Sequence, residues 1–419
     1  MKSQILKQII ADQREYTLPK HFFERELSKT ILEFAEDPSI IITSGIRRSG
    51  KSTIQRALQE TLNEESYFFN FDDERLIQFQ VEDFQLLLEV LIEVAGNHST
   101  FFFDEIQNIK GWERFVRRLY EQGKKIFITG SNANLLSKEL GTHLTGRYIQ
   151  LEAYPLSFRE IVNHESPEIL AKNALSTQNR GHLKGLFSNY IKYGGIPEYV
   201  KFKKPEYLKD LLDGILYRDI ITKYGINDEK ALREVVFYLA SNIGKEFSYT
   251  KIAQMVGIKS PNTISKYCDH FEQCYLFFFI NRYNHSLKKQ IQSNKKSYMI
   301  DPALIRIAGF RVSEDRGRLL ENIVFLHLKR KTKEIYFHKE KKECDFILRE
   351  GNQITEAIQV TTSLSDPSVR KREFAGLLEA MESYNLKKGI ILTEDEEENL
   401  NEKEYSIRII PIHKWLLSL

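Results

Sequence analysis

The stretch GIRRSGKST, residues 45–53, combines two glycines, a lysine and a hydroxyl residue at the spacing G-x-x-x-x-G-K-S. An apolar, β-branched run at residues 40–43 precedes it and predicts a buried strand, and residues 54–58 follow with a helical pattern. The glycines let the backbone bend tightly between strand and helix. The loop N–H groups then form a concave anion site at a helix N-terminus, which is suited to phosphate.

Two side chains of this loop have specific roles in phosphate chemistry. Lys51 supplies a positive charge to the β- and γ-phosphates of a nucleotide, and the Ser52 hydroxyl is a ligand for Mg²⁺. The alternative is a chance glycine–lysine turn after a strand. The candidate nucleotide-binding residues are Gly45, Arg47, Arg48, Ser49, Gly50, Lys51, Ser52, Thr53 and, from a later strand, Ser131.

A second motif, TFFFDE at residues 100–105, is an apolar strand that ends in two carboxylates. Asp104 is expected to hold Mg²⁺ directly or through water, and Glu105 to orient and activate the attacking water. Alone, this pair of carboxylates would indicate only a solvated strand end. Together with the upstream loop it predicts ATP and Mg²⁺ as cofactors of one site.

A third apolar strand, residues 125–132, closes on small polar residues, and either Ser131 or Asn132 is a candidate sensor of the γ-phosphate. The alternative is an ordinary polar strand end, since strands often end at such residues. Arg147 follows shortly afterwards and is a candidate arginine finger, in cis or from a neighbouring subunit. A surface arginine in a structural ion pair is the competing interpretation.

These motifs resemble those of a family of archaeal and bacterial AAA-type ATPases, usually grouped with the STAND-like NTPases. The resemblance rests on residues 45–53, 69–76, 104–113, 129–131, 144–147, 155–160, 193–198, 216–219 and 317–322, and so covers nearly the whole chain. It implies an ATPase core, a winged-helix segment and a C-terminal domain similar to PD-(D/E)xK nucleases. Some members of the family are associated with binding branched DNA.

The predicted fold class is α/β, and five segments are expected along the chain. They are a helical lead-in at 1–37, the P-loop core at 38–162, a helical lid or linker at 163–240, a winged helix at 241–299 and a nuclease-like domain at 300–419. Three cysteines form no disulfide framework or zinc signature. No apolar segment follows residues 1–4 as in a secretory signal, and no run is long enough to span a bilayer, so a soluble cytoplasmic protein is expected.

The winged-helix prediction comes from capping signals. Ser248 is a good N-cap, Gly257 ends the first helix, and Pro261 suits the first turn of the second. Two strands at 274–280 and 295–300 then form a hairpin, or wing. The candidate DNA-binding residues are Asn262, Ser265 and Lys266 on the second helix, and Lys288, Lys289, Lys295 and Lys296 around the wing. The alternative is a pure packing module with solvated lysines.

In the C-terminal region Glu321 and Asp345 match the first two positions of the nuclease pattern, by resemblance. The triplet that should end in lysine is Gln359-Val360-Thr361, and threonine cannot replace the catalytic ammonium. Glu356 lies three residues away, on the opposite strand face. The expectation is a degenerate nuclease site formed by Glu321, Asp345 and Gln359.

The functional prediction is therefore an ATPase coupled to DNA binding, with branched or junction DNA as the substrate suggested by resemblance. The net charge of +3 is nearly balanced, so any nucleic-acid site must be a local patch. The alternatives are a nucleotide-dependent switch acting on protein partners and an ATP-gated nuclease. Homo-oligomer formation is left open.

Overall fold

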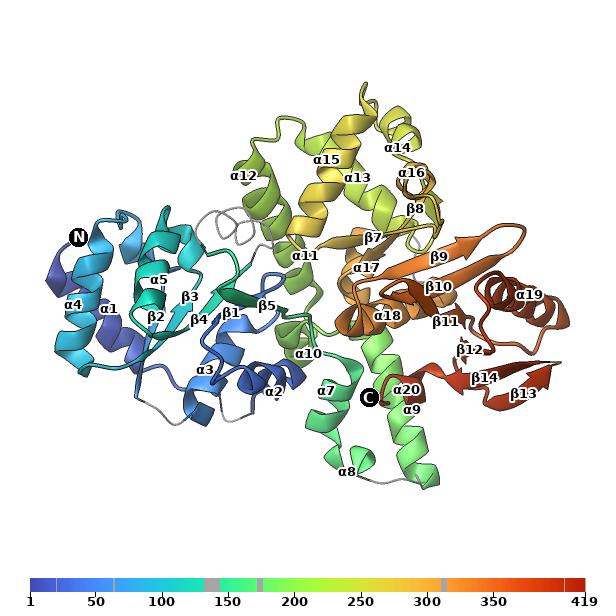
Figure 1. The fold of residues 1–419 in the computed structure, drawn as a ribbon, viewed down its shortest axis with the longest axis horizontal. Helices are drawn as coiled ribbons and strands as arrows, with labels where there is room; N and C mark the ends of the chain where they lie inside the picture. The colour runs from blue at the N-terminus through green and yellow to red at the C-terminus, as the bar shows by residue number, and fades with distance from the viewer. Residues whose placement is uncertain are drawn as a thin grey trace. The chain divides into compact units, whose positions relative to one another are not determined.

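The computed structural model describes residues 1–419 except 20, 63–64, 132–143, 172–175, 310–314, 403 and 419. The chain divides into two compact units (Figure 1). The first contains Met1–Tyr154 with Gln273–Tyr275, and the second contains Pro155–Glu272 with Leu276–Leu419. The finer division into five segments stays a prediction.

The first unit is built on a parallel sheet in the order β2-β3-β4-β1-β5. Its strands are β1 (Ile40–Ser44), β2 (Ser66–Asn70), β3 (Thr100–Asp104), β4 (Lys125–Gly130) and β5 (Tyr148–Glu152). The three strands predicted from the motifs are β1, β3 and β4. Because β4 lies between β1 and β3, the carboxyl ends of all three meet at one edge, where ligands bind in open α/β sheets.

Helices cover both faces of this sheet. They are α1 (Ser3–Arg14), α2 (Glu26–Glu33), α3 (Lys51–Leu62), α4 (Asp83–Ala95) and α5 (Trp112–Glu121). Side chains alternate along β1, so Ile40 and Ile42 pack into one core with α1, α4 and α5, whereas Ile41 packs into the other with α2 and α3. Burial on both faces explains why these strands are continuous apolar runs in the sequence.

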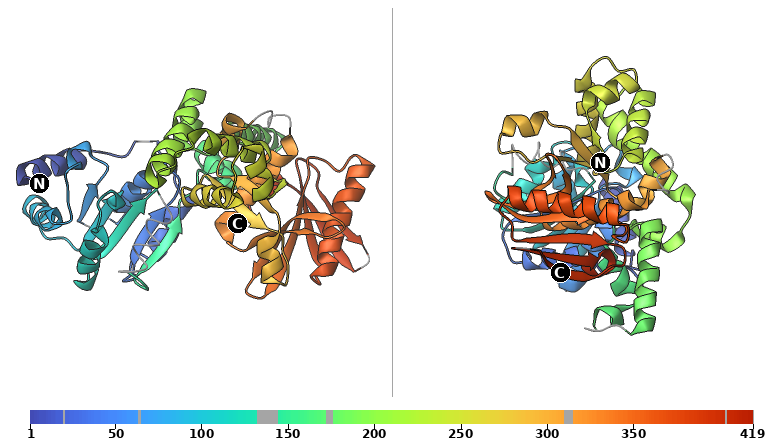
Figure 2. Two further views of the ribbon diagram at one scale, coloured as in Figure 1. Left: turned by 90° about the horizontal axis from the view of Figure 1, so that it is seen from above. Right: turned by 90° about the vertical axis from the view of Figure 1, so that its right-hand side faces the viewer.

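The second unit contains two sheets (Figures 1 and 2). The smaller, β6-β8-β7, consists of β6 (Glu246–Phe247), β7 (Phe277–Asn281) and β8 (Lys295–Met299). The larger, β13-β14-β12-β11-β10-β9, consists of β9 (Ile335–Lys339), β10 (Glu343–Glu350), β11 (Gln353–Val360), β12 (Lys388–Thr393), β13 (Glu398–Glu402) and β14 (Tyr405–Pro411). Helix α19 (Pro367–Ser383) packs on the larger sheet through Leu377, Ala380 and Met381.

The remaining helical segments of the second unit begin at residue 158. They are α7 (Phe158–Glu165), α8 (Pro167–Leu170), α9 (Thr177–Tyr193), α10 (Pro197–Phe202), α11 (Pro205–Gly214), the π-helical Ile215–Ile221, α12 (Thr222–Tyr224), α13 (Glu229–Ser241), α14 (Tyr249–Met255), α15 (Pro261–Gln273), α16 (Leu287–Gln292), α17 (Pro302–Ala308), α18 (Arg316–Lys331) and α20 (Ile412–Trp415). Helix α15 reaches residue 273, which belongs to the first unit.

The capping predictions around α14 and α15 are confirmed. The Ser248 side chain accepts a hydrogen bond from the Lys251 N–H, Gly257 has a φ of +73°, and α15 begins at Pro261. The antiparallel β7–β8 hairpin follows, as expected. Helix α16, which lies in the connection between these strands, was not predicted.

The Gly194–Gly195 pair marks a close approach between segments of the second unit. A Cβ at Gly194 would collide with the Asp301 carboxylate, and one at Gly195 would collide with the Leu156 carbonyl oxygen. The Gly195 N–H donates to Asp301 Oδ2 at 2.6 Å. Burial raises the pKa of Asp301 to about 6, although the hydrogen bonds that it accepts from backbone N–H groups lower this pKa. This packing requires glycine at both positions.

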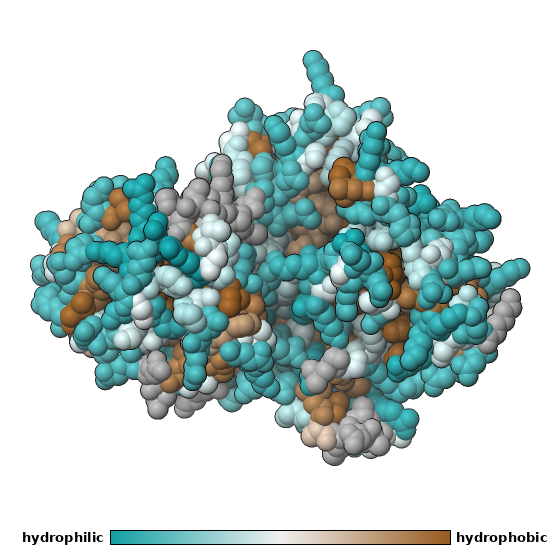
Figure 3. All heavy atoms as spheres, viewed as in Figure 1, coloured by the Kyte–Doolittle hydropathy of each residue, from teal (hydrophilic) through white to brown (hydrophobic). Residues whose placement is uncertain are grey.

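Figure 3 shows a mostly hydrophilic surface on the face drawn, with separate apolar patches. Across the described residues, no helix combines the length and the apolar character needed to cross a membrane.

Candidate functional site

The loop after β1 has the bent backbone that its sequence predicts. Arg48 and Gly50 have φ angles of +64° and +91°, both in the left-handed region. A Cβ at Gly45 would collide with the Ala153 carbonyl oxygen after β5, so the loop can start there only with glycine. Helix α3 begins at Lys51, and its N-terminus therefore opens onto the loop.

Lys51 folds back over this loop. Its side chain is 5% exposed, and Nζ donates to the carbonyl oxygens of Gly45 and Ile46 at 3.1 Å each. Nζ also lies 3.9 Å from Glu105 Oε1. The loop lysine and the second carboxylate of β3 thus share one site, as the sequence predicts.

Asp104 ends β3 and is 2% exposed. Burial and the neighbouring Glu105 raise its pKa, while hydrogen bonds from Thr129 and Ser52 and the charge of Lys51 oppose this shift. The Ser52 hydroxyl therefore lies near enough to the Asp104 carboxylate to lower its pKa. A buried carboxylate with a raised pKa gains most from a cation placed beside it.

Glu105 has a left-handed backbone, with φ +52°. Its N–H donates to Thr129 Oγ1 at 3.2 Å, and its side chain accepts hydrogen bonds from Gln107 and, at 3.1 Å, from Ser131 Oγ. Such a backbone conformation is uncommon outside glycine and often occurs at functional sites. Ser131 is thus placed beside the candidate catalytic carboxylate. Asn132, the other candidate sensor, lies outside the described residues.

The residues present fit a nucleotide with its magnesium. Ser49 Oγ is buried in the loop, and among the described residues it has no hydrogen-bond partner. A phosphate oxygen would satisfy it. The Ser52 hydroxyl and the Asp104 carboxylate would provide the oxygen ligands that Mg²⁺ prefers.

Sequence reasoning missed three residues that hold the site together. Thr129 bridges the Asp104 carboxylate and the Glu105 N–H. Gln55, from α3, donates to the carbonyl oxygens of Phe103 and Phe127 and so ties the helix to β3 and β4. Thr129 was within reach of sequence analysis, because it opens the TGS motif on the third strand; Gln55 had no such signal.

The third residue that sequence reasoning missed is Arg25, which precedes α2 and is 8% exposed. It donates to the Ser49 carbonyl oxygen and to the Tyr154 carbonyl oxygen, both at 2.6 Å. The guanidinium therefore ties the phosphate loop to the segment that leaves β5. Nothing in the local sequence distinguishes this arginine from a surface residue.

Arg25→Ala is expected to lower the free energy of unfolding by about 1.5–3 kcal/mol, because two buried carbonyls lose a charged donor. We also expect weaker Mg·ATP binding, since the loop loses its tether. Urea denaturation and nucleotide titration measure the two effects, with the exposed Arg114→Ala as control. Unchanged ATP affinity in Arg25→Ala would show that the tether does not shape the loop.

The expectation that Arg147 is an arginine finger in cis is wrong. In the parallel register Ile40 pairs with Tyr148 and Ser44 with Glu152, so Arg147 lies at the amino end of the sheet. The phosphate loop is at the other end, about 13 Å further along the strand at 3.3 Å per residue. Arg147 instead lies 3.5 Å from the Glu121 carboxylate and over the Tyr120 ring. This is the structural ion pair of the competing interpretation.

The candidate DNA-binding residues have different environments. Asn262, Lys266, Lys288 and Lys289 are exposed, and Ser265 is half-buried. Lys295 donates to the Asn281 side chain, and burial lowers its pKa.

The prediction that Lys296 contacts phosphates from the wing is wrong, because the side chain is buried inside the second unit. Its side chain is 1% exposed and faces carboxylates, because alternate residues of β8 point to opposite faces.

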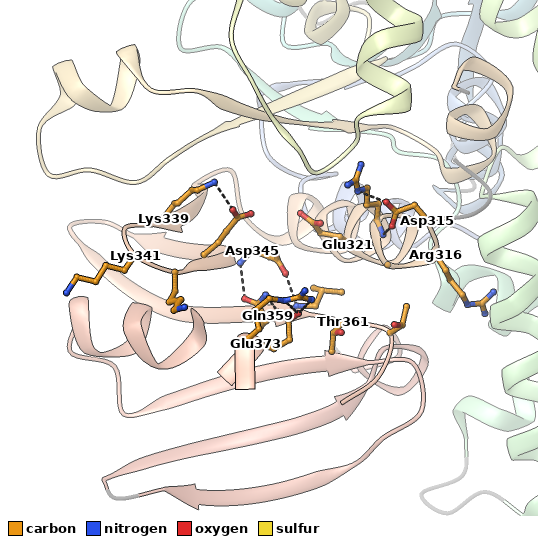
Figure 4. A pocket seen from close by; sticks show the side chains of 16 residues that line it. Asp315, Arg316, Glu321, Lys339, Lys341, Asp345, Gln359, Thr361 and Glu373 are labelled. Atoms are coloured by element: carbon orange, nitrogen blue, oxygen red, sulfur yellow. Dashed lines mark hydrogen bonds and ion pairs between the residues drawn. The ribbon is translucent and has the colours of Figure 1, made fainter. Parts of the chain in front are cut away.

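Glu321, Asp345 and Gln359 do come together in the second unit (Figure 4). The Asp345 N–H donates to Gln359 Oε1 at 3.3 Å, and the Val360 N–H donates to Asp345 Oδ2 at 3.0 Å. Glu373, which was not predicted, accepts a hydrogen bond from the Gln359 side chain. Glu356 is exposed and takes no part, as its strand face predicts.

A family model described as an AAA domain matches residues 37–162. Together with the sheet order and the loop, this match identifies the first unit as an AAA-type P-loop ATPase core. Two further models, each described as a domain of unknown function (DUF8612 and DUF4143), match residues 184–314 and 316–415.

Relatives match along almost the whole chain. The uncharacterized protein MJ1544 of Methanocaldococcus jannaschii is 32% identical over 441 residues, which cover 100% of this chain and 96% of the relative. An uncharacterized protein of Haemophilus influenzae is 32% identical over 406 residues, covering 92% of this chain and 96% of the relative. The chain belongs to the family of these uncharacterized proteins.

Two solved structures show fainter likeness. A Walker-type ATPase of Pyrococcus abyssi has a TM-score of 0.46 at 16% identity and covers 70% of this chain and 99% of its own. The RuvB Holliday junction branch migration motor of Thermotoga maritima has a TM-score of 0.31 at 16% identity, with 66% and 93% covered. These TM-scores are too low to indicate what this chain does.

Proposed function

We propose that the protein hydrolyses ATP in a magnesium-dependent reaction and couples this reaction to DNA binding by its second unit. One observation carries the ATPase proposal: Lys51 Nζ lies 3.9 Å from Glu105 Oε1, and both the Lys51 charge and the Ser52 hydroxyl lower the pKa of Asp104. Phosphoryl transfer needs mainly positioned charge, and this site has the charges in place.

The chain's own residues divide the work as follows. Lys51 exchanges the carbonyls of Gly45 and Ile46 for phosphate oxygens when nucleotide enters. Ser52 and Asp104 would hold the magnesium, which would neutralise charge on the phosphates. Glu105, which accepts hydrogen bonds from Gln107 and Ser131, would orient the attacking water, and Ser131 beside it would contact the γ-phosphate.

The DNA-binding part of the proposal rests on the α14–α15 pair and the β7–β8 hairpin that follows it. Exposed polar side chains lie on α15, and Lys288 and Lys289 are exposed on α16. This order of helices and hairpin suits a winged helix that reads a groove with its second helix. Branched or junction DNA is the form that the family resemblance suggests.

A hydrogen bond offers a route for coupling. Within the first unit, Tyr275 OH and Ser44 Oγ lie 2.7 Å apart. Ser44 is the last residue of the strand before the phosphate loop, and Tyr275 lies two residues before β7 in the sequence. A shift of the loop on nucleotide binding thus acts on the segment that leads into the hairpin.

The test is ATP turnover measured with and without a panel of duplex, single-stranded and junction DNA. We expect at least one DNA form to change turnover. Lys288→Glu/Lys289→Glu is expected to lower DNA affinity about tenfold and to reduce the salt slope of binding by about two.

The matched control is Lys204→Glu/Lys209→Glu, which makes the same charge change at exposed positions outside the hairpin. If no DNA form binds, the nucleotide-dependent switch on protein partners becomes the better account. Metal-dependent cleavage that is lost in Asp345→Ala would instead support the ATP-gated nuclease.

A further inference from the structure

The second unit contains a charged pocket of about 830 Å³ (Figure 4). It lies among the start of α18, the β9–β10 turn, the end of β11 and α19. Five carboxylates line it together with six cations, which are Arg316, Arg318, Lys339, Lys341, Lys342 and Arg372.

A buried lysine supports the carboxylates of this pocket. Lys296 Nζ lies 3.2 Å from Glu321 Oε1, 2.8 Å from Glu343 Oε1 and 3.3 Å from Asp345 Oδ1. An ammonium has three donors, and here they face three carboxylates. Burial works against the charge, but Glu321, with Tyr298, Asp345 and Glu343, raises the pKa of Lys296 well above its usual value. The ammonium therefore stays charged in the folded protein.

This ammonium occupies the position that a metal ion takes in a carboxylate cluster. Carboxylate oxygens gathered around one point are the usual ligands of Mg²⁺ or Ca²⁺. Here the oxygens of Glu321 and Asp345 already face a cation that belongs to the chain. In the described ranges, no group of three or more His, Cys, Asp or Glu side chains is arranged to hold a metal.

Most of the lining cations are engaged, but two are not. In the part of the chain that the structure describes, the engaged pairs are Arg316–Glu394, Arg318–Asp315, Lys339–Glu246 and Arg372–Glu373. Lys341 and Lys342 are exposed in the β9–β10 turn, and no ion pair of theirs falls within the same residues. Figure 4 shows Lys341 reaching outward from the carboxylates. These two lysines are available to an anionic partner.

We propose that this pocket binds the phosphodiester backbone of a nucleic-acid strand through Lys341 and Lys342, with Lys296 in place of a metal ion. Lys341 and Lys342 lie in the exposed β9–β10 turn, whereas Lys296 offsets only part of the charge of the three carboxylates that it contacts. This arrangement suits a chain held by the two exposed lysines better than a small anion held among the carboxylates. The inference rests on the proposed DNA binding and gives it a second set of contacts, on the β9–β10 turn instead of on α16.

The test measures binding of a fluorescent DNA duplex by anisotropy, without nucleotide and with EDTA. Lys341→Glu/Lys342→Glu is expected to weaken binding about tenfold and to lower the salt slope by about two. The control Lys204→Glu/Lys209→Glu should bind like the wild type. If the pocket variant also binds normally while Lys288→Glu/Lys289→Glu does not, this inference fails and the proposed function stands. If the wild type binds neither this duplex nor the single-stranded and junction forms of the panel above, both fail.

A second variant tests the role of the buried lysine. Wild-type binding should be the same with Mg²⁺ and with EDTA. Lys296→Met leaves three carboxylates without their cation, so we expect weaker binding in EDTA and recovery on adding Mg²⁺. Wild-type binding that depends on Mg²⁺ would overturn the assignment of Lys296. If circular dichroism shows that Lys296→Met does not fold, the role of Lys296 is tested by comparing wild-type binding in Mg²⁺ with wild-type binding in EDTA.

Discussion

Lys51→Ala is expected to reduce ATP turnover by about 10²- to 10³-fold or more, because a charged donor aimed at the transferred phosphate is worth at least that much in a buried site. The side chain is almost fully buried, and its ammonium lies within 4 Å of Glu105. Alanine also removes a favourable charge from ground-state binding. We therefore expect the affinity for Mg·ATP to fall together with turnover, as measured by phosphate release and nucleotide titration.

The matched control for this variant is Lys110→Ala, an exposed lysine of the same unit. Its turnover should equal that of the wild type. Turnover retained in Lys51→Ala would show that the loop after β1 is not the phosphate site.

Glu105→Gln is expected to separate binding from hydrolysis. Glutamine keeps the size of the side chain and the hydrogen bond with Ser131 but cannot accept a proton from water. Loss of a general base lowers the rate by about 10²- to 10⁴-fold. Because the carboxylate does not hold the phosphates, Mg·ATP should still bind and raise the melting temperature. This combination differs from Lys51→Ala, in which both properties are lost.

Glu82→Gln, at an exposed position, is the control for Glu105→Gln. If Glu105→Gln hydrolyses ATP at the wild-type rate, another group orients the water. If it loses nucleotide binding as well, Glu105 has a structural role at the loop.

Much of the first unit follows from sequence because its signals are local. The loop motif needs only nine consecutive residues, and the apolar runs before it and at residues 100–103 are long enough to specify strands. Parallel strands that end at one edge then bring Lys51 and Asp104 together without further information. The position of Ser131 beside Glu105 follows from the same rule.

The residues that sequence reasoning misplaced depend on contacts between distant segments. Arg147 follows the sensor strand closely in the chain, but the register of β5 puts it at the far end of the sheet. Arg25 acts on Ser49 and Tyr154, and no motif reports such a tether. Both cases require the tertiary arrangement rather than a pattern.

Lys296 shows the same limit in the second unit. The triplet at residues 359–361 lacks a lysine, and from sequence this absence indicates a degenerate site. In the folded chain an ammonium reaches Glu321 and Asp345 from β8, which lies 25 and 49 positions away in sequence. A lysine that looks like a surface charge in the hairpin is thus a buried partner of the carboxylates.

The most direct test of the account is a crystal structure with a non-hydrolysable ATP analogue and Mn²⁺, whose anomalous signal locates the metal. We predict the metal beside Ser52 Oγ and the Asp104 carboxylate, with Lys51 Nζ on the β- and γ-phosphates instead of on the carbonyls of Gly45 and Ile46. A nucleotide bound elsewhere, with Lys51 still on those two carbonyls, would contradict the account.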